Sequence, residues 1–209
     1  MEIIGLSGFA RVGKDEVAKI LVEDFGFVRV AFADKLREML YQLNPVIAVE
    51  VEDWQVNVGI DEKVIRSGHD EYPVYVQDVI DTYGWDGYKE TQYKDEIRRL
   101  LQRLGTEAGR QTLWDTIWID ATFANINPNA KVVVTDARFY NEFNAIRSRG
   151  GYVWRVERPG VGPLNDHASE TEAINYPHFS LRILNNGTLE ELKKAVGHEY
   201  ENKRYQEFI

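Results

Sequence analysis

The sequence contains no cysteine, two methionines and four histidines among its 209 residues. Without thiols the chain can form neither a disulfide nor a thiolate metal site, and its histidines show no metal-ligand spacing. No apolar run approaches the roughly 20 residues that a bilayer span requires, and the first residues lack a basic leader followed by an apolar core. We therefore expect a cytoplasmic protein with no membrane partner.

Basic residues are also scarce. Lysine and arginine number 25 against 34 acidic residues, which gives a net charge of −9. A broad nucleic-acid footprint needs a basic face, so we expect no nucleic-acid partner. Any phosphate that this protein binds must be held by a local cluster of arginine and lysine. The length suits one domain, or one domain with a sizeable insertion.

The chain begins in the way that a parallel α/β fold begins. The run EIIGLS predicts a buried strand, a helical period follows from Lys14 to Phe25, and FVRVAFA predicts a second strand. The next predicted helix is DKLREMLYQL, with Asp34 as its N-cap. The strongest strand is KVVVTDAR, because a continuous β-branched run is typical of a central strand that is covered on both faces.

The pattern loosens between residues 44 and 93, where we predict one helix at 74–83. A clearer amphipathic helix follows at 95–110. Near the end, YVWRVERPG and LRILNNG predict strands, and Thr188 with Glu191 predicts a capping box for a last helix. We expect a parallel α/β fold in which the loose segment is an insertion over the active edge of the sheet.

The segment GFARVGKDE lies between the first strand and the first helix. It nearly matches the phosphate-binding pattern G-x-x-x-x-G-K-[ST]. Glycines let successive N–H groups turn inward around a phosphate, and the helix N-terminus adds a partial positive charge. A glycine-rich turn with a surface lysine is the alternative, but the strand–loop–helix context favours phosphate binding. The residues predicted to hold a nucleotide here are Gly8, Ala10, Arg11, Val12, Gly13, Lys14, Asp15 and Glu16.

Two aspartates are candidate Mg²⁺ ligands. Asp15 stands where the pattern has a hydroxyl that touches Mg²⁺, and a carboxylate is also a hard oxygen ligand. It could instead accept a proton from an attacking group, or only stabilise the first helical turn. Asp136 ends the strongest strand, as the Mg²⁺ carboxylate of the second P-loop signature does. Arg138 follows it at the edge where open α/β sheets bind ligands.

The helix IRRLLQRLGTEAGR places Arg98, Gln102 and Thr106 on one face and its leucines on another. A guanidinium suits a phosphate and an amide suits a base edge, so this face fits a substrate with both groups. Arg110 is a further phosphate candidate. The alternative is a solvated polar face. The segment ERPGVGPLNDHASE predicts a lid at about 158–170 that contains Arg158, with an ordinary surface loop as the alternative.

The chain resembles phage deoxynucleoside monophosphate kinases of the T-even type. The resemblance extends from Met1 to about Val196 and is carried by SGFARVGKDE, RRLLQRLGTEAGR, VVVTDARFYNEFNAI, VERPG, HASETEA and NNGTLEEL. The Gly-Lys-Asp of the loop is itself a feature of that family. The animal phosphomevalonate kinases are similar too, since they share a Gly-Lys-Asp loop, an Asp-x-Arg after the central strand and a downstream acidic Ser-Glu element.

The resemblance implies an NMP-kinase-like architecture: a three-layer P-loop NTPase-type α/β fold with a parallel sheet. The core would comprise residues 1–43 and 114–209, with the lid at about 158–170, and a helical substrate-binding insertion would comprise 44–113. A homodimer fits the family. If the protein is phage-encoded, the expected location is the host cytoplasm.

The resemblance further implies transfer of the γ-phosphate of ATP to a deoxynucleoside 5′-monophosphate in the presence of Mg²⁺. It implies catalytic roles for Lys14, Asp15, Arg138 and Arg158, and metal binding by Asp15 and Asp136. It implies acceptor binding by Arg98, Gln102, Arg110, Asp136 and Arg138. Two alternatives stay open: a P-loop kinase for another small phosphate such as phosphomevalonate, and a nucleotide-binding module that has lost transfer.

Overall fold

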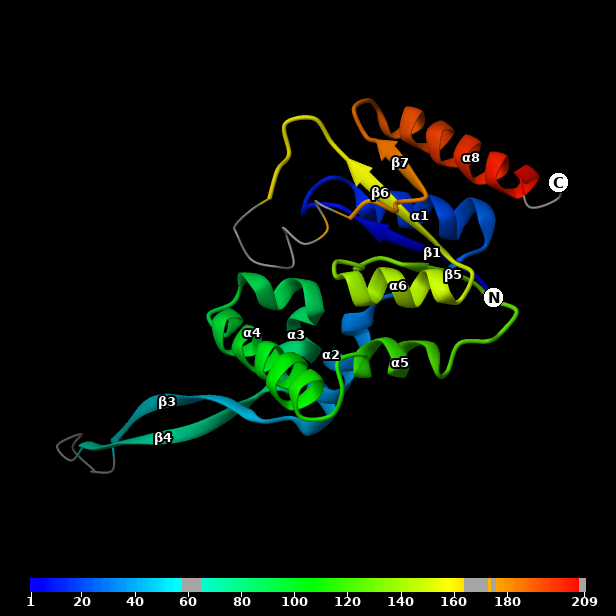
Figure 1. The fold of residues 1–209 in the computed structure, drawn as a ribbon. Coiled ribbons are helices and arrows are strands. Elements are labelled where there is room, and N and C mark those ends of the chain that lie inside the picture. Colours follow the sequence, from blue (N-terminus) through cyan, green and yellow to red (C-terminus); the bar gives the residue numbers. More distant parts are fainter. Residues whose placement is uncertain (58–64, 164–172, 174–175, 207–209) are drawn as a thin grey trace. The chain divides into compact units, whose positions relative to one another are not determined.

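The computed structural model of the chain describes residues 1–57, 65–163, 173 and 176–206 (Figure 1). The chain divides into two compact units. One consists of Met1–Lys35 and Thr116–Ile209, and the other of Leu36–Asp115. The predicted insertion, 44–113, falls inside the second unit. Within the part of the chain that the structure describes, no helix is both long and apolar enough to cross a membrane.

The first unit is built on a five-stranded sheet whose neighbouring strands are all parallel. Its strands are β1 (Glu2–Ser7), β2 (Val28–Val30), β5 (Lys131–Val134), β6 (Tyr152–Glu157) and β7 (Leu181–Leu184). The spatial order is β2-β5-β1-β6-β7, so β1 is central, and Ile4 is aligned with Val133 on one side and Tyr152 on the other. The carboxyl ends of these strands share one edge, where open parallel sheets bind ligands.

Helices cover both faces of this sheet (Figure 1). They are α1 (Lys14–Phe25), α5 (Ile117–Phe123), α6 (Tyr140–Ser148) and α8 (Leu189–Gln206). Leu21 of α1 and Val196 of α8 are buried in one cluster with alternate strand residues. Ile119 of α5 and Phe143 of α6 are buried in the cluster on the opposite face. The α/β fold with three layers, predicted from the sequence, is confirmed.

Helix α2 (Phe32–Leu43) begins before Asp34, so the prediction of Asp34 as its N-cap is wrong. Asp34 lies in the first turn, where its Oδ2 accepts the N–H of Ala31 at 2.8 Å. The first two amides of the helix donate instead to the carboxylate of Asp136. Because the end of β5 supplies these acceptors, the helix starts earlier than its own sequence indicates.

The second unit combines helices with a long hairpin. Its elements are β3 (Val46–Asn57), β4 (Ile65–Tyr75), α3 (Val76–Gly87), a 3₁₀ turn (Tyr88–Glu90), α4 (Lys94–Gln102) and a π-helix (Arg103–Gln111). Leu40, Val79 and Ile97 are buried in a core that belongs to this unit. The second unit therefore has its own hydrophobic core.

The predicted helix at 95–110 consists of two kinds of helix. The chain passes from α4 into the π-helix, in which hydrogen bonds join residues five apart rather than four. Directly after the π-helix, the Thr112 hydroxyl donates to the carbonyl oxygen of Glu107 at 2.7 Å. The sequence pattern locates this segment, but it does not distinguish the wider helix from an α-helix.

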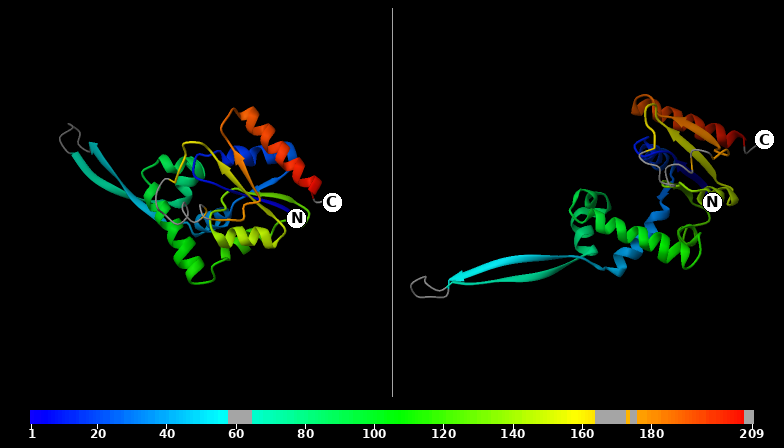
Figure 2. Two further views of the ribbon diagram at one scale, coloured as in Figure 1. Left: turned by 45° about the horizontal axis from the view of Figure 1, so that its top comes forward. Right: turned by 60° about the vertical axis from the view of Figure 1, so that its left-hand side comes forward.

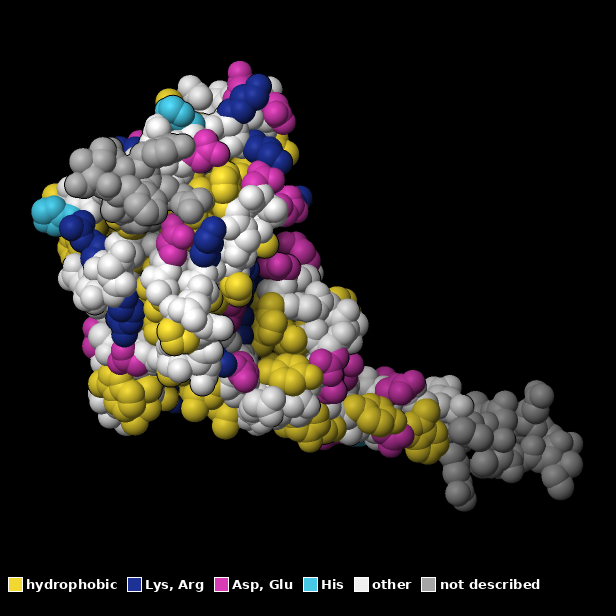
Figure 3. All heavy atoms as spheres, turned by 90° about the vertical axis from the view of Figure 1, so that its right-hand side faces the viewer, with side chains coloured by type: hydrophobic (Ala, Val, Ile, Leu, Met, Phe, Trp, Pro, Cys, Tyr) yellow, Lys and Arg dark blue, Asp and Glu magenta, His cyan; other side chains and the backbone are white. Residues whose placement is uncertain are grey.

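The hairpin of β3 and β4 is not predicted from the sequence (Figure 2). The strands are antiparallel, and Val51 lies opposite Glu71 while Trp54 lies opposite Gly68. Hydrophobic and acidic side chains share its surface in Figure 3, and Val51 is 58% exposed. A strand is recognised by apolar residues that alternate toward a core. This hairpin buries neither face fully, and its alternation of apolar and acidic residues at Val49–Glu52 changes phase at Asp53. The predicted insertion is therefore not only helical.

Candidate active site

The loop between β1 and α1 has a backbone that glycine makes possible. Gly8, Arg11 and Gly13 have φ values of 149°, 65° and 97°. A Cβ on Gly8 would collide with the carbonyl oxygen of Val156, and a Cβ on Gly13 would collide with the side chain of Asn185. Close approach and backbone conformation thus both require glycine at these two positions.

Lys14 is the first residue of α1, and its side chain bends back over the loop. Its Nζ donates to the carbonyl oxygens of Gly8 and Phe9, both at 2.7 Å. The ammonium group is therefore held at the loop, close in sequence to the first amides of α1. A cation and helix N-terminal amides together suit the binding of an anion such as a phosphate.

The other side chains of the loop and of the first turn of α1 range from buried to exposed. Val12 is only 1% exposed and packs in the core, so only its backbone can face a ligand. Ala10 is half-buried, and Arg11 is exposed. Asp15 and Glu16 are exposed in the first turn of α1, where the helix dipole stabilises negative charge. The loop can thus present its amides and Lys14 to a phosphate.

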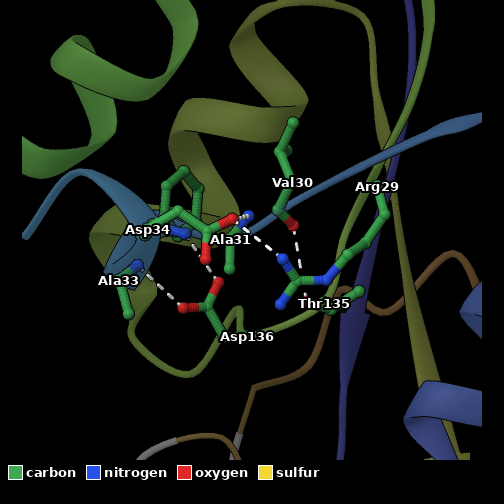
Figure 4. Close-up of polar contacts among 8 residues, drawn as sticks. Arg29, Val30, Ala31, Ala33, Asp34, Thr135 and Asp136 are labelled. Atoms are coloured by element: carbon green, nitrogen blue, oxygen red, sulfur yellow. Dashed lines mark hydrogen bonds and ion pairs between the residues drawn. The ribbon is translucent and has the colours of Figure 1, made fainter. Parts of the chain in front are cut away.

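Asp136 follows β5 and closes the N-terminal end of α2 (Figure 4). Its Oδ1 accepts the N–H of Phe32 at 2.8 Å, and its Oδ2 accepts the N–H of Ala33 at 3.0 Å. Burial raises the pKa of Asp136 above its ordinary value, while these two hydrogen bonds and the charge of Arg138 oppose the rise. A metal ion here would have to use the remaining lone pairs of the carboxylate.

Glu142, a residue that the sequence reasoning missed, orders the loop after β5. It is buried, and its Oε2 accepts the N–H groups of Arg138 at 2.7 Å and Phe139 at 3.1 Å. The backbone of Arg138 is thereby fixed two residues beyond Asp136, while its side chain is exposed. Glu142 stands at the third position of α6, after the N-cap Phe139, which is the place of a capping carboxylate, and an acidic residue near the start of a helical pattern is the signal that the sequence offers for it.

A pocket of about 250 Å³ opens beside the loop, at the carboxyl ends of β6 and β7. Its lining includes Phe9, Arg155, Glu157 and Arg158. Arg155, also missed from the sequence, is only 5% exposed, and its guanidinium carbon lies 4.7 Å from the centre of the Phe9 ring. Glu157 forms an ion pair with Arg182, and its Oε1 lies 3.8 Å from the Nε of Arg155. The pocket thus adds arginine side chains to the edge that carries the loop.

Arg158 is the one predicted lid residue with an assigned role, and it is exposed at the rim of this pocket. The described part of the predicted lid, 158–163, forms a loop after β6. The remainder of that prediction, 164–170, lies outside the described residues. The assignment of 158–170 as a lid stays a prediction.

Asn185, directly after β7, is a further residue that the sequence reasoning missed. Its side-chain amide donates to the carbonyl oxygen of Val12 at 2.9 Å, and its backbone N–H donates to the carbonyl oxygen of Glu157 at 2.8 Å. It therefore joins the phosphate-binding loop to the end of the last strand. An asparagine after a strand is an ordinary turn residue, so the sequence carries little signal for this contact.

The predicted acceptor residues on the helix at 95–110 lie in the second unit. Arg98 and Gln102 are exposed on α4 and stand four residues apart, which places them on one face. Arg110 is half-buried in the π-helix. The α-helical spacing that would bring Thr106 into the row of Arg98 and Gln102 does not apply beyond residue 102, because the π-helix has wider turns.

These features define the class of the protein. A parallel sheet with helices on both faces, a glycine-lysine loop between its central strand and the next helix, and an aspartate at the end of the adjacent strand make up a P-loop α/β protein of NMP-kinase-like architecture.

Comparison with known proteins identifies the family. A family model described as deoxynucleotide monophosphate kinase matches residues 86–196, which is more than half of the chain, and the chain belongs to that family. The loop at Gly8–Lys14 lies outside the matched residues, so its geometry is an independent observation. Kinases of this kind act on nucleotides and use a nucleotide phosphate donor, usually with Mg²⁺.

The chain is similar to three viral proteins along most of its length. It is 24% identical to the deoxynucleotide monophosphate kinase of Escherichia phage RB69, over 94% of this chain and 98% of that protein. It is 25% identical to the deoxynucleoside-5′-monophosphate kinase of Escherichia phage T5, over 69% and 71%. It is 28% identical, over 94% of each chain, to a protein of Acanthamoeba polyphaga mimivirus assigned provisionally as a deoxynucleotide monophosphate kinase.

Proposed function

We propose that this protein transfers the γ-phosphate of ATP to a deoxynucleoside 5′-monophosphate, releasing ADP and a deoxynucleoside diphosphate. The observation that carries the proposal is the loop, where Lys14 Nζ lies 2.7 Å from two loop carbonyl oxygens at the start of α1. The family supplies the substrate class. Because the chain has a net charge of −9, a phosphate needs a local cationic site such as this one.

The reaction asks mainly for alignment and charge neutralisation. An oxygen of the acceptor phosphate attacks the γ-phosphorus, a new P–O bond forms, and the bond from the γ-phosphorus to the bridging oxygen of ADP breaks. The acceptor phosphate has a second pKa of about 6, so it is mainly a dianion at pH 7 and needs no base. This favours a metal role for Asp15 over a proton-accepting role. The loop amides and Lys14 would hold the donor phosphates.

Asp15 and Asp136 would hold Mg²⁺. The two carboxylates differ in how many of their lone pairs are free for the metal ion. Mg²⁺ usually takes one or two carboxylates together with substrate phosphates and water. Asp15 offers an exposed carboxylate directly after Lys14. Asp136 already accepts two amides and would act through a remaining lone pair or a water molecule. When bound, Mg²⁺ would neutralise part of the phosphate charge.

The acceptor roles rest on side-chain chemistry. Arg98, Arg110 and Arg138 carry guanidinium groups, which can pair with phosphate oxygens through two parallel hydrogen bonds. The amide of Gln102 offers both a donor and an acceptor to a base edge. Arg158 would neutralise charge on the transferred phosphate from the predicted lid.

A coupled ADP-release assay tests the proposal. Purified protein with ATP and Mg²⁺ would be offered the four common deoxynucleoside monophosphates, the matching ribonucleotides and phosphomevalonate. We expect turnover with at least one deoxynucleoside monophosphate. Turnover with phosphomevalonate alone would replace the proposal with the second kinase, and ATP binding without any turnover would support a nucleotide-binding module.

A further inference from the structure

Asn185 contacts the phosphate-binding loop from a fixed position on the sheet. It is half-buried at the carboxyl end of β7, and its backbone N–H donates to the carbonyl oxygen of Glu157 at the end of β6, at 2.8 Å. From this position its side-chain amide reaches Val12, 173 residues earlier in the chain, and donates to the Val12 carbonyl oxygen at 2.9 Å. The contact therefore links the loop to the two strands at one side of the sheet.

The hydrogen bond determines how one peptide of the loop is turned. In a planar trans peptide the C=O of Val12 and the N–H of Gly13 point in opposite directions. Because Asn185 holds the Val12 carbonyl on its own side, the N–H of Gly13 is directed away from Asn185. A phosphate-binding loop depends on amides that converge in this way on an anion.

The other contacts of Val12 and Gly13 act on the two ends of this peptide rather than on its own rotation. The side chain of Val12 is buried in the core, which fixes one end. At the other end, the Gly13 carbonyl oxygen accepts the Val17 N–H at 3.1 Å as the N-cap of α1, but without a side chain and with a φ of 97° Gly13 restrains the preceding peptide only weakly. Asn185 packs so closely on Gly13 that any Cβ there would collide with the Asn185 amide. The contact with the Asn185 amide therefore requires glycine at position 13.

We propose that Asn185 is a positioning residue: through Val12 it sets the Gly13 amide for the phosphates of the nucleotide donor. This rests on the proposed function of the loop as the donor site. If Asn185 served only as a turn residue between β7 and α8, its substitution would lower the Tm and would raise the KM values for donor and acceptor equally. If Asn185 positions the Gly13 amide, its substitution weakens binding of the donor phosphates and leaves acceptor binding unchanged.

Three variants separate these roles. Asn185→Ala removes the side chain, and Asn185→Asp keeps its shape while removing the N–H donor and adding a negative charge. The matched control is Asn186→Ala, which changes the same residue type one position later, where the side chain is exposed. Each variant and the wild type would be titrated calorimetrically with ATP and with inorganic tripolyphosphate. The KM values for donor and acceptor and the Tm would be measured in parallel.

We expect Asn185→Ala to weaken ATP and tripolyphosphate binding about tenfold, the cost of one misplaced hydrogen bond to a charged group. Asn185→Asp should weaken both further, because its carboxylate faces the Val12 carbonyl and repels phosphate. The acceptor KM and the Tm should stay near the wild-type values, as should every value for Asn186→Ala.

Unchanged affinity for both probes in the two Asn185 variants would overturn the inference, as would equal increases in the donor and acceptor KM. Tripolyphosphate separates this inference from the proposed function. If the wild type phosphorylates no deoxynucleoside monophosphate, the proposed function fails. Weaker tripolyphosphate binding by Asn185→Ala would still support the role of Asn185 in the loop, and unchanged binding would refute it.

Discussion

The phosphate-binding loop and the helical segment at 94–111 present polar groups in opposite ways. In the loop, the backbone is fixed by the close approach of Gly8 to Val156 of β6 and of Gly13 to the side chain of Asn185, and by the hydrogen bond from Asn185. On the helical segment, long side chains such as Arg98 stand exposed. Under the proposed function, a rigid backbone serves the phosphates that every donor shares. Under the same proposal, side chains on the helical segment serve the acceptor.

The largest effect is expected at the loop. Lys14→Ala should lower kcat/KM for the donor by about 10²–10³-fold, because it removes the cation held beside the loop carbonyls. The measurement is steady-state ADP release, with circular dichroism to verify the fold. Lys19→Ala, on an exposed position of the same helix, is the control and should retain full activity. Wild-type activity in Lys14→Ala would remove the loop from the donor site.

The next effect concerns Asp15. Asp15→Ala should lower turnover by about 10²-fold and raise the Mg²⁺ concentration needed for half-maximal activity, because a hard oxygen ligand is lost. The Tm should change little, since Asp15 is exposed. Activity would be titrated with Mg²⁺ for this variant and for Glu23→Ala, a carboxylate on an exposed part of the same helix. Near-normal turnover at limiting Mg²⁺ would exclude both the metal and the proton-accepting roles.

On the helical side of the comparison, Arg98→Ala should raise the acceptor KM about tenfold and leave the donor KM unchanged, because one charged hydrogen-bonding group is lost. Arg99→Ala is a matched control. Arg99 is the adjacent arginine, and its side chain is paired with Glu96 at 2.5 Å. Equal effects of the two substitutions would mean that only the overall charge of α4 matters, and the specific role of Arg98 would be abandoned.

The smallest effect separates stability from positioning. Thr188 and Glu191 form the predicted capping box: the Thr188 N–H donates to Glu191 Oε2 at 2.7 Å, and the Glu191 N–H donates to the Thr188 hydroxyl at 3.3 Å. Thr188→Ala should lower the Tm by about 2–4 °C, as the loss of a helix cap does in a chain of this size. The donor KM should not change, although Asn185 lies three residues away. A raised donor KM would show that loosening this connection alone disturbs the loop.

The same cap has a defined pH dependence. The hydrogen bonds from Thr188 lower the pKa of Glu191 below its ordinary value. The stabilisation is therefore present above the unfolded-state pKa of about 4.3 and is lost as the pH falls through the folded-state pKa. Thermal unfolding at pH 7 and again near the acid limit should show the Tm values of wild type and Thr188→Ala converging. A constant difference would mean that Glu191 does not contribute through its charge.

The features predicted correctly depend on neighbours in the sequence. The loop at Gly8–Lys14 is bracketed by an apolar strand and an amphipathic helix, and Val132–Val134 form a continuous β-branched run, so local patterns suffice. The start of α2 depends on a carboxylate about a hundred residues later, at Asp136, and local pattern cannot supply it. Asn185 is hidden for the same reason, since its partner Val12 lies near the other end of the chain.

The second unit was harder to predict for a different reason. The hairpin strands bury neither face fully, and the alternation of apolar and acidic residues is confined to Val49–Glu52 and changes phase at Asp53, so the segment has no continuous strand pattern. The π-helix at Arg103–Gln111 has the composition of an α-helix, and only its backbone hydrogen-bond spacing distinguishes it. The roles of the site residues remain predictions, because chemistry and position suggest them but only activity can test them.

The central position of β1 has a consequence for folding during synthesis. β1 ends at Ser7, yet its neighbours in the sheet are β5, which starts at Lys131, and β6, which starts at Tyr152. At a ribosomal rate of about 5–20 residues per second, β1 waits roughly 7–30 s for both partners to emerge. The second unit is one continuous stretch, Leu36–Asp115, and can fold in that interval. The nascent chain would therefore complete its inserted unit before the sheet that carries the phosphate-binding loop exists.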